Sequence, residues 1–528
     1  MRRVLPALPL VLVWTLAAIA WQRLWVFPTL SNDDLFFMTR NEVPPTELTW
    51  RLWRENLSHD LARRNGRSAD AVAQLVFALG PTGTRLVMAG VCWATCLLVW
   101  LWARQFIPAD VARTARGRVA DALAVAGALT LPTACSFWDR WLDSTTLYFM
   151  AATIGYPGGL ALFLAATLPL SHALRRPTTR PWLVWLSLPV TVVTAYHHEI
   201  LALMLAGFAA TALLCWPRCR YRASTAAALL LTVGISLYRL TTPGLQRRRK
   251  ITADVQRQEP HHLQDAVFAL AHFQQRHWGY LLLLAGAVVL VGLAGLARGS
   301  ARRWVSLAGM TLTVTAVSLW CWLGDRTLAQ LDARDVQAWF QMPTGWPLVL
   351  CFVGLWLGGV LTALAGRRPA VVDDGEWPLV LVLAPAAIAP LVPFALRGFE
   401  NRPLFFAYAM FLLTGLCAAV WVVATGRLRP VSLTVQLAAV VMALVALGPG
   451  TVSWYRAWHG LQENHATELW ATQQLEMARD HQLYVVVLPR TLPRTDYASN
   501  WPGFRDSSLG RIRTLYQLEE NVSLSWGD

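Results

Sequence analysis

Two adjacent carboxylates, Asp33 and Asp34, follow the first long apolar run of the chain by only a few residues. If that run crosses a membrane, both acids lie at its boundary, where partial desolvation makes a carboxylate costly. Acids in such places usually serve binding or catalysis. The structural alternative is that they begin a helix, because aspartate is favourable at a helix N-terminus. Their spacing alone leaves both interpretations open.

The elements that must position these acids are long apolar segments. The chain has 528 residues, 55% of them hydrophobic and 15% charged, whereas a soluble protein carries about a quarter charged residues. Apolar stretches of roughly 17–22 residues recur, each long enough for a bilayer core of about 30 Å. They are continuous rather than alternating, which favours helices over a barrel. We therefore predict an all-α polytopic membrane protein with about thirteen transmembrane helices.

The predicted spans share one feature, an uninterrupted apolar run, and cover residues 4–27, 84–107, 119–136, 148–173, 182–196, 200–216, 223–241, 278–297, 305–323, 347–365, 378–396, 404–425 and 431–447. Every second short loop between them is rich in arginine, beginning with Arg2 and Arg3 and continuing at Arg113, Arg116 and Arg118. Such alternation predicts a cytoplasmic N-terminus and, with an odd number of spans, an extracytoplasmic C-terminus.

The formal charge of +15 belongs to these topology-setting loops, so no nucleic-acid partner is expected. Lys250 is the only lysine beside 45 arginines, a bias that indicates a GC-rich bacterial genome and thus a bacterial plasma membrane. The eight cysteines lie in or beside apolar segments. We interpret them as packing residues rather than metal ligands or disulfides.

The predicted outer loops are longer and hold most of the acids. The first covers about residues 28–83 and includes a predicted amphipathic helix, in which Trp50, Trp53, Leu57 and Leu61 recur at helical spacing; we expect it to lie flat on the outer leaflet. The chain divides into a transmembrane domain, 1–449, and an extracytoplasmic tail, 450–528. The tail should begin as a helix, continue as a strand at 483–488, and lie against the membrane domain.

A resemblance to a known family is carried by a few of these residues. An acidic pair early in the first outer loop of a many-helix protein resembles the GT-C glycosyltransferases, which take a sugar from a polyprenyl-phosphate donor at the outer membrane face. Asn65-Gly66-Arg67 is similar to an element of bacterial multi-pass proteins of this kind, as is Asn401-Arg402-Pro403 before a late helix. The tail, with its strand and closing Asn521, is also similar in layout.

That resemblance implies a role for the acids. One carboxylate of Asp33 and Asp34 would take the proton of an acceptor hydroxyl as an oxocarbenium-like centre develops, with inversion at the anomeric carbon. The second acid could orient the acceptor or a metal ion. The phosphate leaving group needs positive charge rather than a strong acid, so cations in the outer loops are the next candidates.

Cations on the predicted outer side could bind that phosphate, because arginine pairs with phosphate bidentately. The candidates are Arg247, Arg248, Arg249 and Lys250, which stand together after an apolar run, and Arg397 and Arg402 in another outer loop. The four-residue cluster has a simpler explanation in contact with anionic lipid head groups.

Two further turns could contact substrate. His198 and Glu199 lie in a tight outer turn, where Glu199 could contact sugar hydroxyls or orient an arginine, or where both could be ordinary hydrogen-bonded helix-end residues. His197 and His198 are adjacent and point to different faces, so one metal is not expected to bind both. Asp139 and Arg140 lie between two tryptophans, an arrangement typical of carbohydrate sites, although 27 tryptophans make such neighbours frequent by chance.

These observations favour a GT-C-like glycosyltransferase that moves a sugar from a polyprenyl-phosphate donor to an envelope glycan or lipid acceptor. Its partners would be the lipid bilayer, the lipid-linked sugar donor and the acceptor; no metal ligand is assigned and a divalent metal stays an open question. A transporter or flippase of lipid-linked glycans is the alternative, but transporters place charges at mid-membrane and often show repeated halves. A non-catalytic membrane scaffold is the third possibility.

Overall fold

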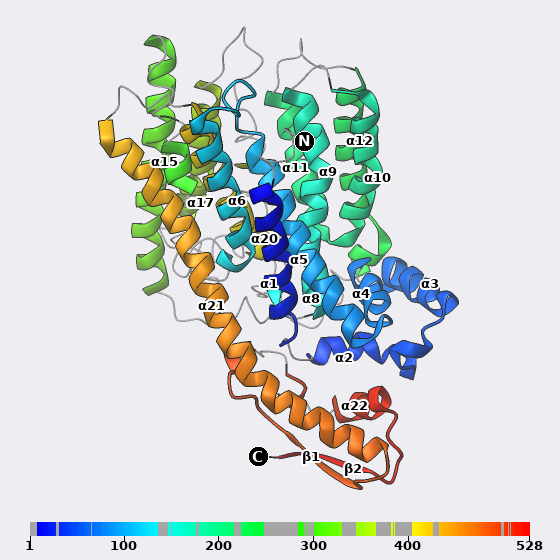
Figure 1. Cartoon of the computed structure of the whole chain (residues 1–528). Helices are drawn as coiled ribbons and strands as arrows, with labels where there is room; N and C mark the ends of the chain where they lie inside the picture. Colours follow the sequence, from blue (N-terminus) through cyan, green and yellow to red (C-terminus); the bar gives the residue numbers. More distant parts are fainter. Residues whose placement is uncertain are drawn as a thin grey trace.

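The computed structural model of the chain (Figure 1) describes residues 8–27, 31–64, 66–135, 146–148, 150–175, 179–215, 223–247, 284–289, 292, 300–329, 345–365, 382–383, 385, 404–425, 432–497, 501–504, 506 and 508–527. Most of these residues are helical, as the apolar runs predicted.

The long helices stand side by side as a bundle (Figure 1). They are α1 (Leu8–Leu24), α5 (Gly80–Arg104), α6 (Ala115–Ala134), α9 (Pro157–Arg175), α10 (Pro181–His197), α11 (Glu199–Cys215), α12 (Ala223–Leu240), α15 (Ser300–Ala329), α17 (Gly345–Ala365), α20 (Leu404–Thr425) and α21 (Ser432–Arg479). Each overlaps a predicted span, although α21 continues well beyond residue 447. The predicted spans 278–297 and 378–396 lie mostly outside the described residues.

Within the described part of the chain, five helices are long and apolar enough to cross a membrane: Gly80–Arg104, Met150–Leu174, Ala223–Leu240, Arg303–Leu323 and Leu404–Ala424. The chain is therefore a helical, multi-pass membrane protein. The total of about thirteen spans stays a prediction.

Helix α20 is the centre of the bundle. It is apolar on every side, and nearly all of its side chains are buried, as expected for a helix surrounded by others. It packs against α5, α6 and α21. Because its N-terminal residues Phe405 and Phe406 also contact Tyr156 at the start of α9, α20 anchors the end of the bundle at which the polar loops gather.

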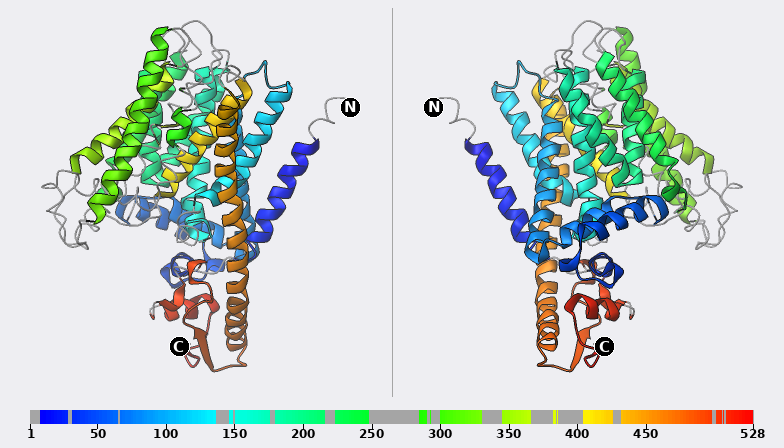
Figure 2. Two further views of the ribbon diagram at one scale, coloured as in Figure 1. Left: turned by 90° about the vertical axis from the view of Figure 1, so that its left-hand side faces the viewer. Right: turned by 90° about the vertical axis from the view of Figure 1, so that its right-hand side faces the viewer.

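The first outer loop folds into short helices across one end of the bundle (Figure 2). They are α2 (Asn32–Met38), α3 (Trp50–His59) and α4 (Ala69–Phe77), with a π-helical turn at Asp60–Arg64 and two 3-10 turns at Arg40–Glu42 and Pro45–Glu47. The short helix α8 (Met150–Gly155) lies against α2 and α4. The tail extends from the same end of the bundle (Figure 2); the topology derived from the basic loops, and which end faces the cytoplasm, stay predictions.

Helix α3 matches the predicted amphipathic segment. The hydroxyl of Thr49 caps its first turn, and Trp50, which is mostly exposed, stacks on Trp53 with ring centroids 4.5 Å apart. Asn56, about one turn after Trp53, is buried against Gln74 of α4. The helix therefore rests on the protein through polar contacts and leaves aromatic surface outside, consistent with contact to a membrane surface.

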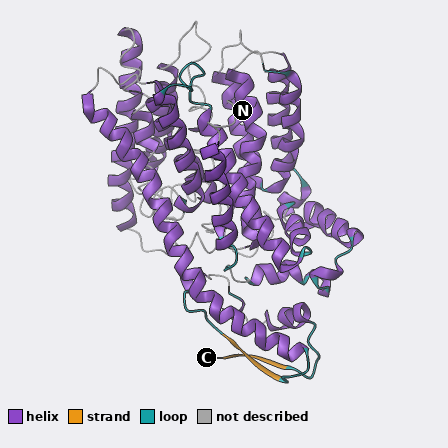
Figure 3. Cartoon of the chain, in the orientation of Figure 1, coloured by secondary structure: helices purple, strands orange, loops and turns teal. Residues whose placement is uncertain are grey.

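The tail is a small α/β unit at the end of α21, and it holds the two strands in Figure 3. Strand β1 (Val485–Pro489) pairs in parallel with β2 (Ser523–Gly527), Val485 opposite Ser523, and α22 (Ser508–Tyr516) forms the crossover that parallel pairing requires. The predicted strand at 483–488 is thus confirmed, whereas its partner was not predicted. Leu35 of α2 enters the apolar core of the tail beside Leu475, Val486 and Ile512, so the tail rests on the first outer loop.

The boundary at 449/450 does not separate two helices. The last predicted span ends at residue 447, yet α21 runs unbroken through Gly448-Pro449-Gly450. Gly450 packs so closely against α6 that a Cβ atom would lie 2.4 Å from the carbonyl oxygen of Thr130. The hydroxyl of Thr133 also donates to the Gly450 carbonyl at 2.8 Å. The small residue serves a close helix contact rather than a break.

Substituting this glycine tests the contact. Gly450→Ala should destabilise the protein by roughly 1–3 kcal/mol, because the added methyl group forces α21 away from α6. Gly448→Ala, two residues earlier in the same helix, meets nothing within 4 Å and should be neutral or stabilising by up to about 1 kcal/mol. Thermal unfolding of the purified variants in one detergent measures both; equal effects would contradict the close contact.

Candidate functional site

Asp34 is locked inside the protein. Its backbone N–H donates to the Ser31 hydroxyl at 3.0 Å, and the Ser31 N–H donates back to Asp34 Oδ2 at 2.9 Å, which forms a capping box at the start of α2. Its Oδ1 accepts the Ala151 N–H of α8 at 2.8 Å. The side chain is fully buried, and this burial raises the pKa of Asp34 to about 7 despite the N–H donors that lower it, with Asp33 raising it further.

Asp33 occupies a different face of α2. Residues three apart share one side of a helix, so Asp33 lies on the side of Phe36, and both are partly exposed. Asp34 and Leu35 occupy the sides turned into the protein. Of the two acids, Asp33 is therefore the one that a substrate could reach.

Two cations flank this face. The guanidinium of Arg64, from the π-helical turn, lies 4.6 Å from the Phe36 ring centroid, and that of Arg511, from α22 of the tail, lies 5.1 Å away. Cation–π contact explains their placement. It also brings positive charge from two separate segments to the exposed side of α2.

The buried pair Arg67–Glu199 joins the first outer loop to the bundle. Arg67 Nε donates to Glu199 Oε2 at 2.6 Å and Nη2 donates to Oε1 at 2.5 Å, a bidentate contact. The side chains are only 15% and 3% exposed. Burial lowers the pKa of Arg67, but the charge and hydrogen bonds of Glu199 outweigh it and leave that pKa raised. Both residues are committed to each other, which makes them positioning residues.

His198 closes the cluster on the side of the bundle. Its Nδ1 lies 3.5 Å from Glu199 Oε2, and its ring packs against Tyr156 and Phe406 at 5.4 and 5.6 Å between centroids. The starts of α9, α11 and α20 thus meet the returning loop at one point. His198 and Glu199 lie at a helix end and form hydrogen bonds there, as one interpretation of the sequence had it. Glu199 also orients an arginine, Arg67, as another hypothesis had it.

Gly66 shows why its sequence element has this form. Its φ of +69° is a conformation that favours glycine, and a Cβ atom there would lie 2.9 Å from Arg239 Nη2. Arg239, fully buried at the end of α12, donates to the Gly66 carbonyl and lies 5.3 Å from the Tyr196 ring. Ser68 N–H donates to the Tyr196 carbonyl at 2.9 Å. The loop is therefore clamped on both sides of Arg67.

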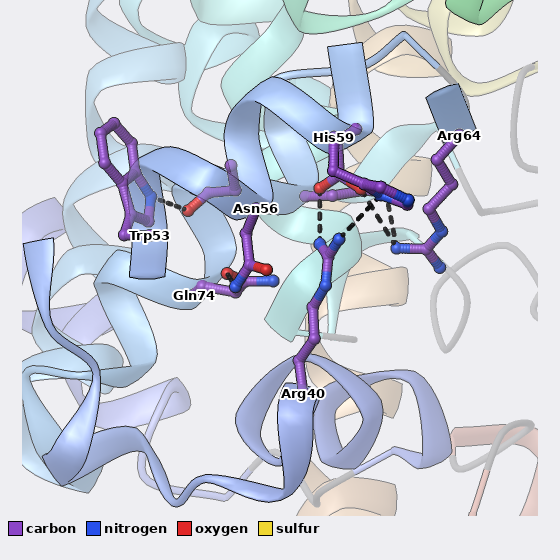
Figure 4. Close-up of polar contacts among 9 residues, drawn as sticks. Arg40, Trp53, Asn56, His59, Arg64 and Gln74 are labelled. Carbon is purple, nitrogen blue, oxygen red and sulfur yellow. Dashed lines mark hydrogen bonds and ion pairs between the residues drawn. The ribbon is translucent and has the colours of Figure 1, made fainter. Parts of the chain in front are cut away.

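A second polar group ties the loop helices together (Figure 4). Asp60, fully buried, accepts Arg40 Nη1 at 2.7 Å and lies 3.6 Å from Arg64 Nη1. Trp53 Nε1 donates to the Ala71 carbonyl at 2.8 Å, and Asn56 Nδ2 donates to Gln74 Oε1 at 3.1 Å. These contacts hold Arg64 in place below Phe36.

The structure places part of the predicted site. It brings Asp33, Asp34, Arg67, His198 and Glu199 to the same end of the bundle, and Arg247 is exposed two residues beyond Leu245, whose backbone approaches Gly66. The remaining candidates lie outside the described residues: Asn65, Asp139, Arg140, Arg248, Arg249, Lys250, Arg397 and Arg402.

Sequence reasoning missed three arginines of this region. Arg239 has a visible signal, a charge at the end of an otherwise apolar helix. Arg64 and Arg511 have none, because their proximity to α2 arises only from the folding of the loop and the tail.

The cavity beside α2 does not enlarge the candidate site. A cavity of about 40 Å³ lies between Leu35 and the tail, with Trp501 and Tyr516 in its wall; that is room for one or two waters and not for a sugar ring. Within the described residues, no three His, Cys, Asp or Glu side chains converge as a metal site.

Comparison of the chain with family models, with curated proteins and with solved structures returned no match. The residue geometry alone therefore carries the functional argument.

The buried pair can be tested by removing one charge. Glu199→Gln keeps the size of the side chain but leaves Arg67 buried without a counter-charge, so the free energy of unfolding should fall by roughly 3–5 kcal/mol. Glu55→Gln breaks the exposed pair with Arg51, whose side chains are 84% and 59% exposed, and should change nothing measurable. Thermal unfolding of both variants makes the comparison; a stable Glu199→Gln would refute the anchoring role.

Asp34 should make stability depend on pH. Its pKa rises from the ordinary 3.8 to about 7 on folding, so between these values the unfolded chain releases a proton that the folded protein retains. This contribution to stability is complete below the lower value and is lost as the pH rises towards the higher one. Unfolding of wild type and Asp34→Asn at pH 5 and pH 8 should show the variant gaining relative to wild type at pH 8. A pH-independent difference would contradict the burial of an ionisable Asp34.

Proposed function

We propose that this protein is a glycosyltransferase that uses a polyprenyl-phosphate-linked sugar, with Asp33 as its general base. The proposal rests on one observation above the others: α2 presents a partly exposed carboxylate on a face flanked by two guanidinium groups. A base and a cationic cradle are what transfer from a glycosyl phosphate requires.

The chemistry assigns each group one task. The Asp33 carboxylate takes the proton of the acceptor hydroxyl while the hydroxyl oxygen bonds to the anomeric carbon. The bond from that carbon to the phosphate oxygen breaks, and its electron pair leaves with the phosphate. Arg64 and Arg511 offset the charge on the departing phosphate. Attack opposite to the leaving group inverts the anomeric configuration.

The neighbouring groups support this assignment by elimination. Asp34 is fully buried with both oxygens bound by backbone N–H groups, and Glu199 is saturated by Arg67. Neither is open to an acceptor. They instead fix α2 and the loop, so that Asp33 is held by rigid neighbours.

The position of α2 suits a lipid-linked donor. Seven residues separate it from the end of α1, and α1 leans away from the bundle (Figure 2). Leu12, Leu16 and Ile19 of α1 are exposed, so a polyprenyl chain lying along this apolar surface would bring its phosphate to the level of α2. An extracytoplasmic location of this end, in a bacterial plasma membrane, is part of the proposal.

The test is transfer by purified protein in nanodiscs. Radiolabelled sugars on polyprenyl phosphate, a panel of hexoses and pentoses, are supplied with a membrane glycolipid extract as acceptor. Asp33→Asn keeps the size of the side chain but removes the base, so transfer should fall about 10²–10⁴-fold with unchanged thermal unfolding. Glu42→Gln, an exposed acid in the same loop, is the matched control and should retain activity.

Two results would overturn the proposal. One is wild-type transfer by Asp33→Asn, which would make this acid structural. The other is no transfer by the wild type from any donor of the panel.

A further inference from the structure

A second polar cavity lies at the end of the bundle opposite to α2. Its volume is about 360 Å³, within the size range of small-molecule sites, and it is an open cavity lined by the end of α5, the loop that follows, the start of α6 and α9. Helix α5 rises from the loop helices to this end (Figure 1) and terminates at Arg104. The cavity is therefore at the level where an apolar helix leaves the membrane, the level of lipid head groups.

The cavity wall carries hydrogen-bond donors whose orientation is fixed by neighbouring residues. The Ser171 hydroxyl donates to Gln105 Oε1 at 2.9 Å, which fixes the amide. Gln105 Nε2 is buried and has no hydrogen-bond partner among the residues described. The Arg104 guanidinium lies 5.0 Å from the Trp100 ring centroid, and its Nε lies 3.8 Å from Asp121 Oδ1. A buried amide N–H without an acceptor is costly, so a ligand oxygen here would be favoured.

An acceptor stands on the other side. Asp121 Oδ1 receives Trp100 Nε1 at 2.9 Å and lies 3.8 Å from Arg104 Nε. In the described part of the chain, these contacts use only one of the two carboxylate oxygens. Asp121 Oδ2 can therefore accept from a ligand cation while Arg104 and Gln105 donate to a ligand anion.

We propose that this cavity binds the head group of a zwitterionic phospholipid that carries a phosphate ester and a primary ammonium. The phosphate would accept from Arg104 and Gln105, and the ammonium would donate to Asp121. Leu101 and Ile107 supply the apolar wall for the start of the acyl chains. This site is separate from the glycosyl-transfer proposal and does not depend on it.

Lipid retention tests the site directly. Purified protein in detergent is incubated with phosphatidylethanolamine, phosphatidylglycerol or soluble glycerophosphoethanolamine, and bound molecules are counted by native mass spectrometry. Wild type should retain phosphatidylethanolamine in preference to the other two. Arg104→Gln should lower retention of both lipids at least about tenfold, and Asp121→Asn should lower only phosphatidylethanolamine by a similar factor.

Matched controls come from the same loop. Arg113→Gln and Asp110→Asn make the same charge changes at exposed positions outside the cavity wall and should retain lipid as the wild type does. In Gln105→Glu a carboxylate replaces the amide donor but can still accept from Ser171. This variant should lose the phosphate contact, and it serves as an independent test if another variant folds poorly.

Three outcomes would overturn the proposal. They are unchanged retention in Arg104→Gln, Asp121→Asn and Gln105→Glu, equal retention of phosphatidylglycerol by the wild type, and equal binding of soluble glycerophosphoethanolamine, which would make the site one for a free phosphoester.

Discussion

The arrangement of the loop end depends on one buried ion pair, Arg67–Glu199. Two charges taken out of water are tolerated only with close geometry and hydrogen bonds, and the bidentate contact supplies both. The pair joins a loop that follows α1 to the first residue of α11. Breaking the pair would leave a buried charge without its partner, which is strongly unfavourable. The pair therefore fixes the position of the loop and of the groups on it.

Helix α2 is the element that depends most on this fixed position. Asp34 binds it to α8 through Ala151, and Leu35 binds it to the core of the tail. One seven-residue helix is thereby held by the bundle on one side and by the tail on another, although such a helix would not persist alone. The side left over carries Asp33 and Phe36. The partly exposed acid is thus a consequence of these two attachments.

Much of the bundle could be predicted because a lipid solvent demands long, continuous apolar helices, and these are visible in sequence. Strand β1 was visible for a similar reason, as a run of β-branched residues. Its partner β2 was not, because Ser523–Gly527 gains its pairing only through the crossover at α22. The continuation of α21 past residue 447 could not be predicted, because a glycine that ends a helix and a glycine that admits a neighbouring helix look alike in sequence; the contact of Gly450 with Thr130 shows the second case. For the site, the sequence identified Asp33, Asp34, Arg67 and Glu199 but could not divide them into exposed and locked groups.

Helix geometry divides these residues into exposed and locked groups. Adjacent aspartates are equivalent in sequence, yet a helix turns them about 100° apart, so one can enter the protein while the other faces out. Asp34 then needs donors for both oxygens and finds them in Ser31 and Ala151. Asp33 stays partly exposed on another side of α2, where a substrate can reach it. The same logic separates Arg67, whose fork is filled by Glu199, from Arg64 and Arg511, which reach the exposed side of α2 from different segments. Charges that are buried and paired hold the fold, and the partly exposed charges beside α2 are the ones that a substrate can reach.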